Sequence, residues 1–363
     1  MIRYITLLMK KTVYNRNNLR MLLAAVLVIF GICLMNLEAN GTDNYRFRME
    51  RDFRHNTTMA EHSADPGLKD LYQGFADRYG QILLKLDEQD YRAMYDVQLE
   101  ILNEQMEMQG YASPALNTLQ RDIEVIETLQ REELLQDSYL YPVMGVPFLV
   151  QCFENLFPYL LTLLNCFIFT GICTARYKEK VNVNRILPMN RNLDDICTFA
   201  VCFLVSLCTF AVMSTFAYLC AGTVSGFSSF RYPYIFYGAS GTSCGTVGDT
   251  VMPVIVLYLL YTAFSFLVTG ILSKLLRRAN AVFLVSAVIL LGIGYMTQVI
   301  EPMRAYAHIL PTSYYNSMYV ASGFCRQYVY QNPNMSFLSG LKILGLSVTV
   351  LAAVFPVMNI REQ

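Results

Sequence analysis

Long apolar stretches alternate with shorter polar segments along the 363 residues of the chain. An α-helix rises 1.5 Å per residue, so about 20 mostly apolar residues cross the ~30 Å hydrocarbon core of a bilayer. The pattern therefore predicts an all-α polytopic membrane protein with six transmembrane helices. The six stretches are Met21–Leu37, a segment within Val143–Ala175, Ile196–Gly222, Val251–Ser273, Ala281–Ile300 and Phe337–Met358.

Residues 1–20 carry a different pattern. Ile2, Ile5, Leu8, Met9 and Val13 recur at helical spacing among polar residues. This pattern predicts an amino-terminal amphipathic helix that lies on the inner surface of the membrane. A frayed basic tail is the alternative.

Residues 38–142 form the longest polar segment, between the first two spans. Apolar residues recur at steps of three and four from Pro66 to Gln109, and again from Leu116 to Leu129. Gly110 separates the two runs, and the polar segment Asp87–Asp90 interrupts the first. We expect a helical domain built on a hairpin, with residues 143–363 forming a five-span membrane domain.

Composition supports a membrane protein and gives no support to nucleic acid as a partner. Hydrophobic residues make up 54% of the chain and charged residues 15%, against about 25% charged in soluble domains. The net charge is zero, so nothing favours nucleic acid, which attracts a basic surplus. The charge is segregated, however. Glu38–Asp137 holds 21 acidic and 10 basic residues, a local charge of −11, and the rest of the chain carries +11.

The basic residues of the short segments predict the topology, because Lys and Arg favour the cytoplasmic side. Four segments hold 14 of them and the opposite loops hold three, Arg231, Arg304 and Arg326. We therefore expect a multi-pass protein of the plasma membrane with both termini cytoplasmic and residues 38–142 extracytoplasmic. The 14 are Arg3, Lys10, Lys11, Arg16, Arg20, Arg176, Lys178, Lys180, Arg185, Arg191, Lys274, Arg277, Arg278 and Arg361.

Few residues suggest chemistry within the chain itself. It contains no Gly-Lys dipeptide for a phosphate-binding loop, and its three His residues form no two-His helical motif. Glu154 is the one acid inside an apolar run, where a charge is costly and usually functional. It either lies at the membrane interface as a structural residue or faces a translocation path.

Two of the ten cysteines fall in predicted outside loops. Cys244 and Cys325 could form a disulfide in an oxidising compartment, and two free thiols are the alternative. The other eight lie in or next to the spans, where cysteine behaves as a small apolar residue.

The segment after the second span carries a family resemblance. It reads ARYKEKVNVNRILPMNRNLDDICTFAVCFLV, a basic stretch with Leu-Pro-x-x-Arg, and two aspartates placed to cap the next helix. This segment resembles the ABC type-2 permease family, as does HILPTSYYNSMYVASG between the fifth and sixth spans. In two respects the chain departs from that family. Glu179 is followed by Lys180 and Val181 instead of x-Gly, and the domain after the first span is large, as in a subset resembling drug and peptide exporters.

The resemblance implies the permease subunit of a bacterial ABC exporter of peptides, drugs or lipids. The chain would pair with a second copy or a similar permease within the membrane lipids. It would not be an enzyme and would bind no cofactor, since two separate ATPase subunits would hold ATP and magnesium. The cytoplasmic coupling loop 176–195 would contact the ATPase through Arg176, Lys178, Glu179, Arg185, Leu187, Pro188 and Arg191.

The translocation path implied by the resemblance follows the second and fifth spans. Its polar candidates are Asn165, Tyr295 and Gln298, together with Glu154. Ordinary hydrogen bonding between helices is the alternative role for the first three. A membrane sensor whose acidic outer domain binds a ligand is the alternative function.

Overall fold

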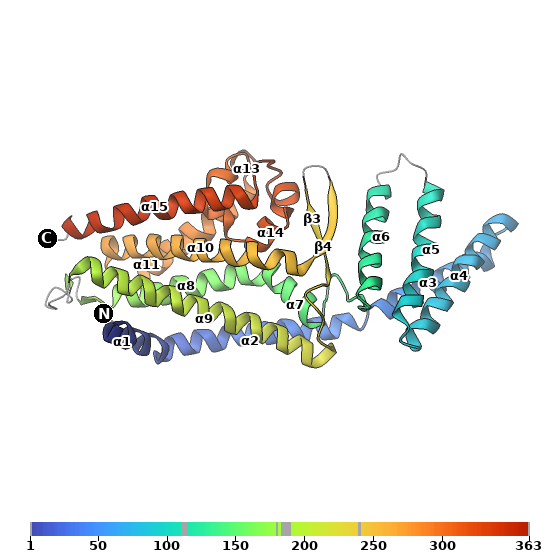
Figure 1. Cartoon of the computed structure of the whole chain (residues 1–363), viewed down its shortest axis with the longest axis horizontal. Helices are drawn as coiled ribbons and strands as arrows, with labels where there is room; N and C mark the ends of the chain where they lie inside the picture. Colours follow the sequence, from blue (N-terminus) through green and yellow to red (C-terminus); the bar gives the residue numbers. More distant parts are fainter. Residues whose placement is uncertain (1, 110–114, 179–180, 183–189, 239–240, 362–363) are drawn as a thin grey trace. The chain divides into compact units, whose positions relative to one another are not determined.

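The computed structural model describes residues 2–109, 115–178, 181–182, 190–238 and 241–361. The chain is mostly helical (Figure 1), and within these residues six helices are long and apolar enough to cross a membrane. The six predicted spans are confirmed as helices of the required length and apolar composition, as expected of a multi-pass membrane protein. They are α2 (Arg16–Asn40), Gly145–Thr174, α9 (Arg191–Ser225), α10 (Val247–Leu276), Ala279–Val299 and α15 (Phe337–Arg361).

Two of these spans contain a π-helical turn. Gly145–Thr174 consists of α7 (Gly145–Gln151), the π turn η1 (Cys152–Leu156) and α8 (Phe157–Thr174). Ala279–Val299 consists of α11 (Ala279–Ala287), the π turn η3 (Val288–Gly292) and α12 (Ile293–Val299). Pro158 lies in the first turn of α8, directly after η1. Proline removes a backbone donor, and π turns of this kind are frequent at functional sites.

The chain divides into two compact units. The first comprises Met1–Phe30, Gln151–Ala217 and Thr250–Gln363, and the second comprises Gly31–Val150 and Tyr218–Asp249. The second unit thus contains residues 38–142 together with the ends of several spans.

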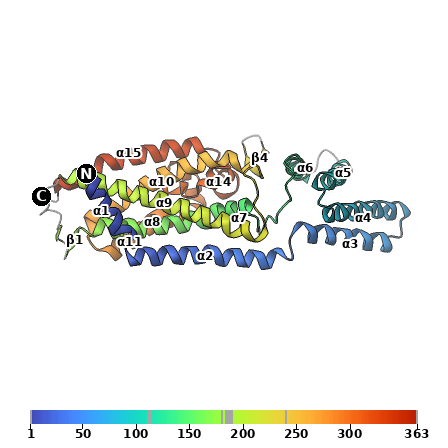
Figure 2. The same cartoon turned by 60° about the horizontal axis from the view of Figure 1, so that its bottom comes forward.

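Four helices make up the polar part of the second unit, here called the polar helical domain. They are α3 (Tyr45–His62), α4 (Pro66–Asp87), α5 (Tyr91–Gln109) and α6 (Ala115–Arg131). Each packs against the next, and Figure 2 shows α3 along α4 and α5 beside α6. The break in the first arm is confirmed between α4 and α5, where Gln89 has φ +59°. The predicted hairpin of two arms is incomplete, because the domain also contains α3.

Strands correct the all-α prediction. β1 (Tyr177–Lys178) pairs antiparallel with β2 (Val181–Asn182), and β3 (Pro233–Tyr237) pairs antiparallel with β4 (Thr242–Thr246). The second hairpin packs against α6. The backbone N–H of Cys244 donates to the Glu124 carboxylate at 3.1 Å, so β4 is bonded to α6 of the polar helical domain.

The first unit begins with α1 (Ile2–Val13), and it contains the partly buried segment between the fifth and sixth spans. The apolar residues Ile5, Leu8 and Met9 of α1 pack on a core from α8, α9, α10 and α15. The later segment contains α13 (Glu301–Arg304), η4 (Ala307–Ile309), η5 (Pro311–Tyr314), α14 (Ser317–Ala321) and the π turn η6 (Cys325–Val329). Its residues Tyr314 and Val320 belong to a second core cluster of the unit.

Candidate functional site

A cluster of buried charges lies where α8 ends in the first unit. The guanidinium of Arg176 lies 2.7 Å from one carboxylate oxygen of Asp195, and the ammonium of Lys274 lies 2.8 Å from the other. The side chains of Arg176 and Asp195 are 7% exposed and that of Lys274 is 1% exposed. Asp194 adds a second carboxylate 3.7 Å from Arg176, so two positive and two negative charges balance.

Further contacts connect this cluster to two more helices. Tyr4 of α1 donates a 2.6 Å hydrogen bond from its hydroxyl to Asp194. Lys274 donates to the backbone carbonyl of Phe355 in α15 at 3.2 Å, and its ammonium lies 3.6 Å from the centre of the Phe355 ring. Charge-assisted hydrogen bonds in a low-dielectric interior are strong and directional. The cluster therefore joins α1, the end of α8, α9, α10 and α15 at one place.

The cluster corrects one sequence interpretation and refines another. Arg176 was predicted to contact a partner, but its side chain is buried and paired within the chain. Asp194 lies in the first turn of α9, near the helix amino terminus as predicted, but the side-chain cap comes from Asn190, whose oxygen accepts from the N–H of Asn192 at 3.0 Å. Both aspartates also form ion pairs with Arg176.

The remaining coupling residues are only partly described. Arg191 begins α9 and is partly exposed, and the backbone of Lys178 lies in β1. Glu179, Arg185, Leu187 and Pro188 lie outside the described residues, as does the side chain of Lys178. The contact surface predicted for 176–195 therefore stays a prediction.

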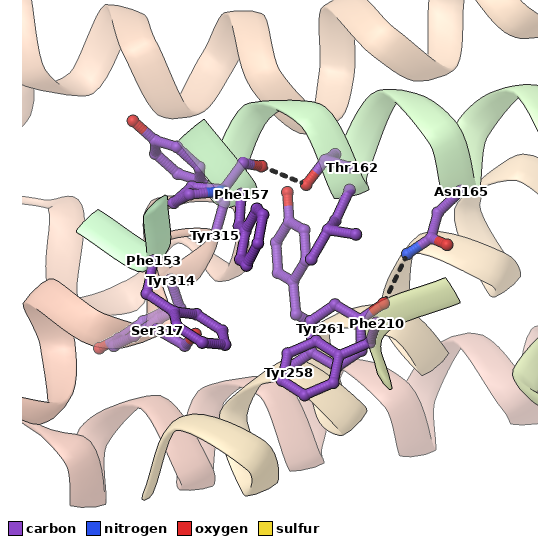
Figure 3. A pocket seen from close by; sticks show the side chains of 12 residues that line it. Phe153, Phe157, Thr162, Asn165, Phe210, Tyr258, Tyr261, Tyr314, Tyr315 and Ser317 are labelled. Carbon is purple, nitrogen blue, oxygen red and sulfur yellow. Dashed lines mark hydrogen bonds between the residues drawn. The ribbon is translucent and has the colours of Figure 1, made fainter. Parts of the chain in front are cut away.

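A small cavity of about 20 Å³ lies elsewhere in the first unit, among α8, α9, α10, η5 and α14 (Figure 3). Its lining includes the polar side chains of Thr162, Asn165 and Ser317. A cavity needs roughly 10–15 Å³ to hold one water. This cavity therefore has room for about one water molecule in the present conformation. The lining also contains seven aromatic side chains, Phe153, Phe157, Phe210, Tyr258, Tyr261, Tyr314 and Tyr315.

Asn165 provides the polar wall of this cavity. It is 3% exposed, and its Nδ2 donates to the Tyr258 hydroxyl at 3.4 Å (Figure 3). That hydroxyl lies 2.7 Å from the hydroxyl of Ser206 in α9. The Oδ1 of Asn165 is buried without a protein partner. A buried amide oxygen of this kind favours a bound water or a polar ligand atom.

The other predicted path residues are distributed around this cavity. Gln298 donates from Nε2 to the hydroxyl of Tyr315, a lining residue, at 2.7 Å. Glu154 lies in η1 and is half-buried, and its backbone carbonyl accepts from Asn316 at 2.7 Å. Tyr295 is 55% exposed on α12 and is not among the lining residues. The structure thus brings Asn165 and Gln298 to one aromatic network and leaves Tyr295 outside it.

The predicted disulfide is not formed, because Cys244 and Cys325 are both free cysteines. Cys325 is 2% exposed inside the core of the first unit. Cys244 lies in β4 of the second unit, where its sulfur is 3.9 Å from the Thr128 hydroxyl. Each of the two thiols is therefore packed within its own unit, without a disulfide between them.

One short motif resembles a hydrolase signature in sequence but not in structure. Residues 241–245 read Gly-Thr-Ser-Cys-Gly, the Gly-x-Ser-x-Gly spacing of hydrolase nucleophile elbows. Such an elbow requires a strand-to-helix turn. Ser243 instead lies within β4 and pairs with Phe236. Among the described residues, no group of three or more His, Cys, Asp and Glu side chains could hold a metal.

Comparison of the chain with protein-family models, with curated proteins and with solved structures finds no match. The class of protein is therefore defined by the spans and the two sites of the first unit: a six-span membrane protein with a buried ionic cluster and an aromatic cavity.

Proposed function

We propose that this chain is the permease subunit of an ABC exporter, which forms a translocation path and is driven by separate ATPase subunits. The observation that carries the proposal is the charge cluster of Arg176, Asp195 and Lys274. It lies at the start of the basic connection between α8 and α9, where the family resemblance falls. A partner that binds this connection would act directly on a rigid junction of helices.

The residues of the cluster also support the proposed topology. Tyr4, Arg176 and Lys274 belong to three of the segments that the Lys and Arg distribution assigns to the cytoplasm. Phe355 lies near the end of the last span, before the fourth such segment. Segments that share one membrane side must meet at one end of the spans, as these four do. In the proposal, α1 is the cytoplasmic amphipathic helix and residues 38–142 are extracytoplasmic.

The cluster is suited to transmit force because its charges are buried and paired. Separating one partner would leave a charge without compensation in a low-dielectric interior, which costs several kcal/mol. Helices tied in this way move together more readily than they separate. ATP-driven movement of the connection would therefore displace α8, α9 and α10 as a body, as in rigid-body transitions of other proteins.

In the proposal, the aromatic cavity is the closed form of the translocation path. With room for about one water, it admits no peptide, drug or lipid in this conformation. Asn165 lies on its wall and Gln298 bonds to the lining residue Tyr315. Movement of α8, α9 and α10 together against the segment that supplies Tyr314, Tyr315 and Ser317 would enlarge the space between them, so the same residues would line an open path.

Co-purification tests the proposal. The chain should co-purify with a P-loop ATPase, and in proteoliposomes candidate peptides, drugs or lipids should stimulate ATP hydrolysis by the complex. The double substitution Leu187→Ala with Arg191→Ala should lower the stimulated rate and leave expression intact. Arg231→Ala, an exposed residue of the opposite predicted side, is the matched control and should leave the rate unchanged.

Two results would contradict the proposal. Full coupled transport by the double variant would remove the coupling role from the segment after α8. If the chain binds no ATPase and its polar helical domain binds a ligand, the result would favour a function as a membrane sensor.

A further inference from the structure

Three consecutive bulky side chains of the second unit point outward just before α7. Tyr139 is 78% exposed, Leu140 is 61% exposed and Tyr141 is 40% exposed. The neighbouring residues Ser138 and Val143 are buried. Exposed apolar residues scattered singly are normal, whereas contiguous exposed apolar groups are typical of sites that contact proteins or membranes.

The base of this segment is held by hydrogen bonds to one carboxylate. Oδ2 of Asp137 accepts from the backbone N–H groups of Val143 at 2.8 Å and Met144 at 2.7 Å, and Oδ1 accepts from Ser138 at 2.8 Å. The N–H of Asp137 itself donates to the hydroxyl of Tyr232 at 2.9 Å. The segment is therefore a fixed turn, and its three side chains are held outward because their backbone is closed on itself.

Two asparagines tie the same turn to the end of α2. Asn36 donates to the carbonyl of Pro142 and Asn40 donates to that of Tyr141, both at 2.9 Å. On the outer face of α2, the exposed apolar residues continue through Met35 to Leu37, and Glu38 begins the polar sequence. The turn therefore lies level with the place where the exposed apolar surface of α2 ends.

We propose that Tyr139, Leu140 and Tyr141 insert into the headgroup layer of the bilayer and anchor the second unit to the membrane surface. The partner is the boundary between phospholipid headgroups and acyl chains. Tyrosine combines an apolar ring with a hydroxyl, and it is enriched at this depth for that reason. Leucine between two tyrosines adds apolar area facing the acyl chains. The continuity of the turn with the apolar face of α2 favours lipid over a protein partner.

The absence of tryptophan from the chain allows a direct test. Tyr139→Trp in the full-length protein is reconstituted into phosphatidylcholine vesicles whose acyl chains carry bromine either near the headgroup or near the bilayer centre. Bromine quenches tryptophan fluorescence on contact. We expect strong quenching by the shallow bromine and weaker quenching by the deep one.

Two matched variants calibrate the depth. Leu34→Trp, on the exposed apolar face of α2, should respond to brominated lipid at greater depth than Tyr139→Trp. Leu84→Trp, exposed on α4, should respond only to aqueous iodide. Adding Asp137→Ala to Tyr139→Trp releases the base of the turn, so the difference between shallow and deep quenching should shrink.

The proposal is overturned if Tyr139→Trp behaves like Leu84→Trp, because the turn would then face water. Protection from both iodide and brominated lipid would also overturn it, since the turn would then be covered by a second copy of the chain or another protein. Because Tyr139 is exposed, its replacement should leave the melting temperature in detergent unchanged. The fluorescence therefore reports on the folded protein.

Discussion

Arg46 in the polar helical domain and Arg176 in the first unit both pair with an aspartate at nearly the same distance, 2.8 Å to Asp87 and 2.7 Å to Asp195. The side chains of the first pair are 54% and 55% exposed, whereas both side chains of the second are 7% exposed. Exposed pairs gain little because water solvates and screens each charge. The buried pair has no such alternative, so its charges depend on each other.

The largest expected effect comes from removing the shared carboxylate. Asp195→Ala leaves Arg176 and Lys274 buried with only Asp194 to compensate them, and breaking a buried ion pair in this way costs about 3–5 kcal/mol. We expect a large fall in the melting temperature of the purified protein in detergent. Adding Lys274→Met restores the balance of charge and should recover part of the loss. An unchanged melting temperature in Asp195→Ala would show that the cluster does not hold the helices together.

A change in stability of intermediate size is expected when a glycine in each of the two regions is replaced by alanine. A Cβ on Gly294 in α12 would lie 2.7 Å from the carbonyl oxygen of Thr312, so Gly294→Ala should destabilise by about 1–3 kcal/mol. On Gly80 in α4 a Cβ would lie 3.5 Å from the Phe53 ring, an ordinary contact. Gly80→Ala should instead stabilise by about 0.5–1 kcal/mol, because glycine disfavours a helix interior.

Thermal unfolding of both variants checks this prediction. Gly345→Ala is the control within the first unit, because its Cβ would meet nothing within 4 Å. Equal behaviour of Gly294→Ala and Gly345→Ala would mean that the backbone of α12 can move away from Thr312 without cost.

The smallest effect is expected at the exposed pair. Arg46→Ala removes the contacts to Asp87 and Glu50, and water replaces both. Its melting temperature should equal that of the unaltered protein within error, at low salt and at 1 M NaCl. A clear fall at low salt that disappears at high salt would show that the surface charges act as a network.

The spans could be predicted because each is a continuous apolar run. Their ends could not, since α2 begins at Arg16 and α9 at Arg191, in polar sequence. α3 was missed for a related reason: its few buried residues, including Tyr45 and Met49, are spread among charged ones. The β3–β4 hairpin had a usable signal, because aromatic and β-branched residues precede a Gly/Ser-rich turn.

The candidate site was only partly predictable. Asn165 and Gln298 stand out as polar residues in apolar runs, but their tyrosine partners come from helices distant in the sequence. Lys274 was counted only as a loop charge. Its partner Asp195 lies 79 residues earlier, and no local pattern relates the two. Pairing of this kind is set by how the helices pack, which a single sequence does not encode locally.

The spacing of the cluster along the chain has a consequence for biosynthesis. Arg176 and Asp195 are 19 residues apart, so they can neutralise each other as soon as the third span has emerged from the ribosome. Lys274 follows 79 residues after Asp195, and the carbonyl of Phe355 another 81 residues later. Lys274, the most buried charge of the cluster, is therefore synthesised after its counter-ion Asp195. The last span then completes the junction.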